Sequence, residues 1–184
     1  MVIWDLRQIP QLRALLADVP GLPAAEFAKS FIAQFEADIA PRLATLRQQF
    51  LHNDLNVGNI LVDETDESRI AGIIDFGDAV HTALIADVAI ALVGQITTLE
   101  KVEEEIRDFV LAYQAVEPLH RAELEILNSL IAARIVQGLV IPSWHRAKNP
   151  SATHFNAFDA AHVERRVALA ERLLTTRITV PDAR

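Results

Sequence analysis

The chain has 184 residues, about half of them apolar, which suits a single domain with a sizeable core. Its net charge of -8 and its three lysines argue against binding to nucleic acid or to an anionic membrane surface. It has no cysteine, which excludes disulfides and thiolate metal sites, and its N-terminus lacks the pattern of a signal peptide. We therefore expect a cytoplasmic protein without membrane or nucleic-acid partners.

Residues 1–50 are expected to form a helical lead-in. A short helix is predicted over residues 11–17, and a longer one begins near Ala24. The longer helix carries phenylalanines at the three-to-four spacing of a core-facing stripe: Phe27, Phe31 and Phe35. Pro41 interrupts that pattern, so a kink or a break is predicted there.

Two apolar runs follow, at residues 59–62 and 70–74, and predict two short buried strands. The polar run between them, residues 63–68, reads as the connection of a hairpin. Pairing of these strands would bring Asn59 close to Asp75.

The rest of the chain, residues 79–184, is expected to be a helical subdomain. Helices are predicted at residues 84–97, 100–115, 118–140 and 156–175. The first is apolar nearly all round and should be central, although it is too short to span a bilayer. Pro142 and Pro150 bound a predicted loop that holds Trp144, His145 and Arg146.

Two motifs flank the predicted hairpin. His52-x-Asp54-Leu55-x-x-x-Asn59 precedes its first strand, and Asp75-Phe76-Gly77 follows its second. We call residues 52–59 the catalytic loop and residues 75–78 the metal loop, because their order matches these signatures of the protein-kinase-like fold. Either motif alone is common as a capped loop or a turn. Their conjunction at strand ends indicates a phosphotransferase-type site.

The residue types suit that chemistry, which is mostly positioning and charge neutralisation. Asp54 has the place of the carboxylate that orients the acceptor hydroxyl and accepts its proton. Magnesium prefers hard oxygen ligands, and Asn59 and Asp75 supply an amide oxygen and a carboxylate. His52 is expected to brace the loop. Asp78 is either a helix-capping carboxylate or a group that attracts a substrate ammonium or a second magnesium ion.

Residues 52–93 resemble the aminoglycoside phosphotransferase and choline kinase superfamily. Within it they are most similar to the hydroxylysine kinase group, which shows a similar Trp-Asp-Leu opening, His-x-Asp-Leu-Asn loop and Ile-Asp-Phe-Gly-Asp loop. The likeness spans essentially the whole chain, but only residues 52–78 are sharply diagnostic. It implies an α+β, mostly helical fold: the C-terminal lobe of a protein-kinase-like enzyme, with a small β-hairpin carrying the catalytic and metal loops.

The resemblance also implies roles for single residues. Asp54 would be the catalytic base, and Asn59 and Asp75 the ligands of Mg²⁺, with ATP or GTP as the phosphoryl donor. Asp87 lies where such enzymes carry an acid early in the next helix, and we expect it to brace the catalytic loop. The alternative for Asp87 is a buried carboxylate with a purely structural hydrogen bond. The two interpretations nearly coincide, because a buried acid without partners would be costly.

The acceptor is expected to be a small molecule. No activation segment ending in Ala-Pro-Glu follows the metal loop, and Asn53 replaces the arginine that would read an activation-loop phosphate. The leading acceptor is an alcohol or amino alcohol such as 5-hydroxylysine, followed by choline-like amino alcohols, homoserine and aminoglycosides. Possible substrate-binding residues on the helical side are Arg134, Trp144 and Arg146. An arginine there could hold a carboxylate, although solvated arginines are commoner.

Two parts of a kinase are missing from the sequence. No Gly-x-Gly-x-x-Gly run occurs, and none of the three lysines lies on a convincing strand. We therefore expect residues 1–184 to be one C-lobe with the N-lobe absent, and the isolated chain to be inactive or incomplete. The alternative is a non-catalytic fragment or a binding module that needs a separate N-lobe. The surface where such a lobe docks should remain exposed, unless a homodimer covers it.

Overall fold

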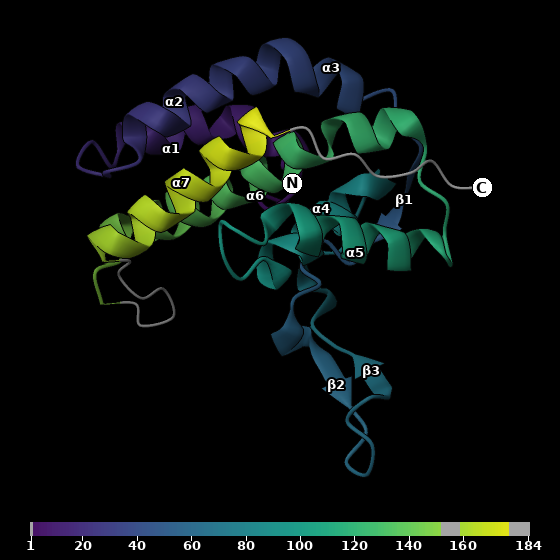
Figure 1. Ribbon diagram of the computed structural model, residues 1–184. Helices are drawn as coiled ribbons and strands as arrows, with labels where there is room; N and C mark the ends of the chain where they lie inside the picture. The colour runs from purple at the N-terminus through teal and green to yellow at the C-terminus, as the bar shows by residue number, and fades with distance from the viewer. Residues whose placement is uncertain (1, 152–158, 177–184) are drawn as a thin grey trace.

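A β-hairpin projects from a helical body in the computed structural model, which describes residues 2–151 and 159–176 (Figure 1). The N-terminal segment contains the 3-10 helix η1 (Leu6–Gln11), α1 (Leu12–Ala17), α2 (Ala25–Gln34), the π-helical turn η2 (Phe35–Ile39) and α3 (Ala40–Leu43). The helices after the hairpin are α4 (Leu84–Gln95), α5 (Val102–Gln114), α6 (Arg121–Lys148) and α7 (Ala160–Thr175). The mostly helical α+β class is therefore confirmed.

The described strands form two antiparallel pairs. The outer pair joins β1 (Gln48–Leu51) to β4 (Val80–Ala83), with Leu51 opposite Val80, and we call it the stem. The inner pair joins β2 (Ile60–Val62) to β3 (Ile70–Ile73) and is the predicted hairpin. Residues 52–79 thus leave the body and return to it between the two strands of the stem, so both loops of interest lie at one place.

The hairpin strands are exposed, whereas the sequence predicted buried strands. Val62 is 48% exposed and Ile70 is 64% exposed. Figure 1 shows the reason, because β2 and β3 extend away from the helices and contact no second layer within the described chain. Apolar runs of this kind predict a strand, but they do not predict which other elements bury it.

Helices α4 and α6 form the centre of the core. Eight residues of α4 are buried, as its apolar sequence predicts, and α4 packs along α6. Helix α6 has 28 residues and would reach across a bilayer by length alone. Two-thirds of its most apolar stretch is buried inside the protein, which is typical of a core helix.

Helix α6 also overturns a prediction. The expected loop around Trp144 and Arg146 is helical, because α6 continues through Pro142 to Lys148. Proline removes one helical hydrogen bond and normally ends or kinks a helix. Here Ile141 and Pro142 are buried in the core, and packing of this face outweighs the lost bond.

Other boundaries differ from the prediction. Residues 48–51 and 80–83 are strands, not a helical lead-in and a link. The predicted start of the last helix, residues 156–158, lies outside the described residues. A kink or a break is expected at Pro41; the chain stays helical there, and the regular α-helix is replaced by the π-helical turn η2 directly before α3, which contains Pro41.

Candidate functional site

The catalytic loop turns sharply at Asn53. Its φ of 64° is in the left-handed region, which costs energy for a residue with a side chain but is tolerated best by asparagine and aspartate. The backbone N–H of Asn53 donates to Asp87 Oδ1 at 2.8 Å, which anchors the loop to the first turn of α4. Burial raises the pKa of Asp87, and this hydrogen bond partly offsets the effect. Asp87 thus contacts the catalytic loop, as the sequence led us to expect.

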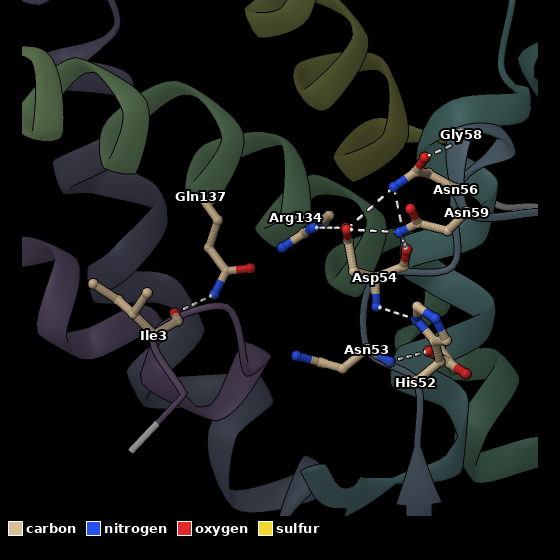
Figure 2. A network of polar contacts seen from close by, with 10 residues as sticks. Ile3, His52, Asn53, Asp54, Asn56, Gly58, Asn59, Arg134 and Gln137 are labelled. Atoms are coloured by element: carbon tan, nitrogen blue, oxygen red, sulfur yellow. Dashed lines mark hydrogen bonds and ion pairs between the residues drawn. The ribbon is translucent and has the colours of Figure 1, made fainter. Parts of the chain in front are cut away.

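The turn at Asn53 presents Asp54 to a set of donors (Figure 2). Arg134 Nη2 donates to Asp54 Oδ1 at 2.7 Å, and Asn59 Nδ2 and Asn56 Nδ2 donate to Oδ2 at 3.1 and 3.2 Å. The same Asn59 nitrogen also donates to the backbone oxygen of Asp54 at 2.9 Å. The carboxylate of Asp54 is therefore held from two sides, with its side chain 28% exposed.

Arg134 is built into this arrangement. Its side chain is 12% exposed, and its guanidinium carbon lies 4.4 Å from the centre of the Trp4 ring. Gln137, one turn further along α6, donates to the backbone oxygens of Ile3 and Asp5, both at 3.2 Å, on either side of Trp4. Burial lowers the pKa of Arg134, and the charges of Asp54 and Asp78 oppose that shift.

The metal loop has a second left-handed residue. Asp75 has a φ of 63°, and its Oδ1 accepts from the Gly77 N–H at 3.4 Å. His52 connects this loop to the catalytic loop: its Nε2 donates to the Ile74 oxygen at 2.8 Å, and its Nδ1 accepts from the Asp54 N–H at 3.3 Å. These two contacts require the neutral tautomer that carries its proton on Nε2.

Strand pairing brings the two predicted metal ligands together. The backbone N–H of Ile74 donates to the backbone oxygen of Asn59 at 3.0 Å. Asp75 therefore directly follows the residue that pairs with Asn59 across the two strands. Asp78 lies in the same region, since burial and then the charges of Asp54 and Asp75 raise its pKa while Arg134 opposes them. Three carboxylates therefore share this end of the hairpin.

A magnesium ion fits the donor types found here. The described residues contain no group of three or more His, Asp or Glu side chains suited to hold an ion by themselves. Magnesium usually takes one or two carboxylates and completes its shell with water and phosphate oxygens. The amide oxygen of Asn59 and the second carboxylate oxygen of Asp75 accept no hydrogen bond from the described residues, so both are free to act as ligands.

Two of the predicted substrate-binding residues lie elsewhere. Trp144 is ten residues beyond Arg134 on α6, about 15 Å along the helix. Its Nε1 donates to Asp18 Oδ2 at 2.9 Å, and Arg146 lines a pocket with Asp18. The structure therefore brings Arg134, and neither of the other two, to Asp54.

Some members of the site were not anticipated. Asn56 accepts from the Gly58 N–H at 2.8 Å and donates to Asp54, and its place two residues before a glycine is typical of an Asx turn. Trp4 belongs to the Trp-Asp-Leu opening, but nothing in the sequence places it against Arg134, and no local signal marks Gln137.

Comparison with known proteins agrees with this geometry. The model of the phosphotransferase enzyme family matches residues 2–126, more than half of the chain. The chain is 28% identical to hydroxylysine kinase of Danio rerio over 150 residues, covering 80% of this chain and 42% of that protein. It is 30% identical to hydroxylysine kinase of Xenopus laevis over 148 residues, covering 76% and 39%. It is 36% identical to homoserine kinase of Methylobacillus flagellatus over 91 residues, covering 47% and 27%.

The chain thus spans about two-fifths of the length of the hydroxylysine kinases that it matches. The family match includes the stem, the hairpin, both loops and the anchoring residue Asp87. On this evidence, the chain belongs to the phosphotransferase enzyme family.

Proposed function

We propose that this protein is a small-molecule kinase that transfers the γ-phosphoryl group of ATP or GTP to an alcohol. The observation that carries the proposal is the arrangement around Asp54. This carboxylate is fixed by Arg134 and Asn59 and lies at the same end of the hairpin as Asp75. Such an arrangement suits a reaction in which most of the catalysis is positioning and charge stabilisation.

In the proposed mechanism, Asp54 orients the acceptor hydroxyl and takes its proton as the oxygen attacks the γ-phosphorus. The bond between that phosphorus and the β–γ bridging oxygen breaks, and ADP or GDP leaves. Arg134 and the two asparagine amides hold the carboxylate in place, so little reorganisation is needed during the reaction. Asn59 and Asp75 would hold Mg²⁺, which supplies neutralisation of the phosphate charge. His52 keeps the two loops in register through its contacts with Ile74 and Asp54.

The proposed acceptor is a hydroxylated amino acid, with 5-hydroxylysine first. Two kinds of relative support this class, because both hydroxylysine and homoserine carry a hydroxyl group on an amino-acid frame. Choline-like amino alcohols and aminoglycosides remain the next candidates. Asp78, whose pKa is raised by burial and by the charge of Asp54, is the carboxylate proposed to attract a substrate ammonium group.

We further propose that the chain is the C-terminal lobe of the enzyme and that a nucleotide-binding lobe docks against the hairpin. Exposed apolar residues on or beside β2 and β3 support this proposal: Val57, Leu61, Val62, Ile70, Ile73, Ile74 and Phe76. A two-stranded hairpin has little stability alone, and large exposed apolar patches usually mark a binding surface. A non-catalytic module that binds a separate lobe is the second candidate, and the same surface favours it.

The test compares Asp54→Asn with Asp63→Asn in the full-length protein, using ATP, Mg²⁺ and 5-hydroxylysine. Asp63 serves as the control because its carboxylate accepts a hydrogen bond from the Thr65 N–H. This turn belongs to the hairpin connection and lies away from the catalytic loop. Asp54→Asn should lower kcat by roughly 10² to 10⁴ while nucleotide binding persists. A full rate in Asp54→Asn would rule out Asp54 as the base. No phosphorylation of any of the proposed acceptors by the full-length wild-type protein would favour the binding module.

A further inference from the structure

A pocket lies at the far end of α4 from the catalytic loop. Residues 96–100, which follow α4, face one side of α7, and together they enclose about 370 Å³. The α7 side chains that line this pocket are His162, Arg165, Arg166 and Leu169. Their spacing marks one side of α7, next to the buried face that packs on the body through Val163, Ala170 and Leu173. This side carries two arginines, of which Arg165 is exposed and Arg166 half-buried.

Arg166 is the unusual member. Its side chain is only partly exposed, and burial alone lowers its pKa. Among the described residues no acid pairs with it, whereas Arg172, on the same helix, pairs with Glu103 at 2.6 Å. Withdrawing a guanidinium from water without a counter-charge is costly, so a buried arginine is ordinarily paired.

The acids near the pocket are committed to other partners. Glu105 accepts from the Thr97 N–H at 2.9 Å. Glu100 accepts hydrogen bonds from its own backbone and from Thr98, which lower its pKa, and it forms no ion pair with either arginine. With Arg165, Arg166 and Glu100 charged, the lining carries a formal charge of +1 in a chain whose net charge is -8.

We infer that this pocket binds a small oxyanion, a phosphate or a carboxylate, through the guanidinium of Arg166 with Arg165 beside it. Guanidinium groups match both oxyanions through paired N–H donors. The pocket volume is in the range of small-molecule sites. The inference is independent of the proposed kinase activity, since none of the pocket residues belongs to the Asp54 site.

Helix α4 connects the pocket to the Asp54 site. Helix α4 begins beside the catalytic loop, where Asp87 accepts from Asn53, and ends at the pocket, where Ile96 follows it.

The test measures binding of inorganic phosphate, and separately of malonate, by calorimetry and thermal unfolding, with chloride at equal ionic strength as the blank. Wild-type protein should bind at least one of the two oxyanions saturably and unfold at a higher temperature in its presence. Arg166→Met should weaken this binding by about tenfold or more. Without the anion, Arg166→Met should unfold at a temperature equal to or above that of the wild type, because it removes a half-buried charge that pairs with no acid among the described residues.

Arg172→Met is the matched control, since it removes an exposed arginine of α7 and should keep the anion response. Arg166→Gln, which is also uncharged, replaces Arg166→Met if the latter fails to fold. The inference is overturned if wild-type protein shows no saturable binding of either anion up to about 20 mM, or if Arg166→Met and Arg166→Gln respond to the anion as wild type does. Response to phosphate alone, or to malonate alone, identifies which oxyanion the pocket takes.

Discussion

The ion pair between Arg134 and Asp54 should be strongly coupled in stability. Its atoms are 2.7 Å apart, and the two side chains are 12% and 28% exposed. Removing one partner of a fully buried pair costs about 3–5 kcal/mol, but the exposure of Asp54 lets water reach it, so we expect about 2–3 kcal/mol for Arg134→Met. The coupling energy between the two positions should be about 2 kcal/mol, as for hydrogen bonds to charged groups.

The assay is a double-mutant cycle with Arg134→Met, Asp54→Asn and the double variant, followed by urea unfolding. The pair Arg42–Glu125 is the control, because its atoms are 2.8 Å apart but its side chains are 43% and 50% exposed. That surface pair should show less than about 1 kcal/mol of coupling. A coupling below about 0.5 kcal/mol for Arg134 and Asp54 would refute the view that this pair fixes the carboxylate.

Three further outcomes are expected. Asn53→Gly should be about 1 kcal/mol more stable than Asn53→Ala in denaturant unfolding, because only glycine adopts the left-handed turn without cost; equal stabilities would contradict this. The raised pKa of Asp87 makes its contribution to stability full below its ordinary value of 3.8 and lost as pH rises through the raised value. The free energy of unfolding of Asp87→Asn should therefore rise relative to that of the wild type between pH 4 and pH 8. A difference in unfolding free energy that does not change with pH would contradict this prediction. Leu130→Ala, in the core, should cost about 3 kcal/mol and Leu61→Ala, on the exposed hairpin, under about 1 kcal/mol; similar costs would mean that the hairpin is covered in solution.

The local parts of the site could be predicted from the sequence. Residues 52–59 and 75–78 carry their motifs within short runs, and the apolar stretches between them are long enough to indicate a hairpin. Strand pairing then places Asp75 one residue beyond Ile74, which pairs with Asn59. The roles of these residues in catalysis remain predictions.

The long-range parts could not be predicted. Arg134 is 80 residues from Asp54, and only the packing of α6 brings them together. The local chemistry of Pro142 predicts a helix end, whereas burial of the surrounding face of α6 keeps the chain helical. The four-residue strands of the stem lack a periodic pattern long enough to distinguish them from loops.

The stem has a consequence for how the molecule can open. Asn53 and Asp54, next to the stem, hold residues 52–79 to α4 and α6, so β2 and β3 beyond them can fluctuate without forcing these helices apart. Amide hydrogens of β2 and β3 should then exchange with solvent through local opening of the hairpin, whereas those of α6 should exchange only through global unfolding. The projecting strands and the helical body would then form two cooperative units, and substitutions on β2 and β3 would cost the body little stability.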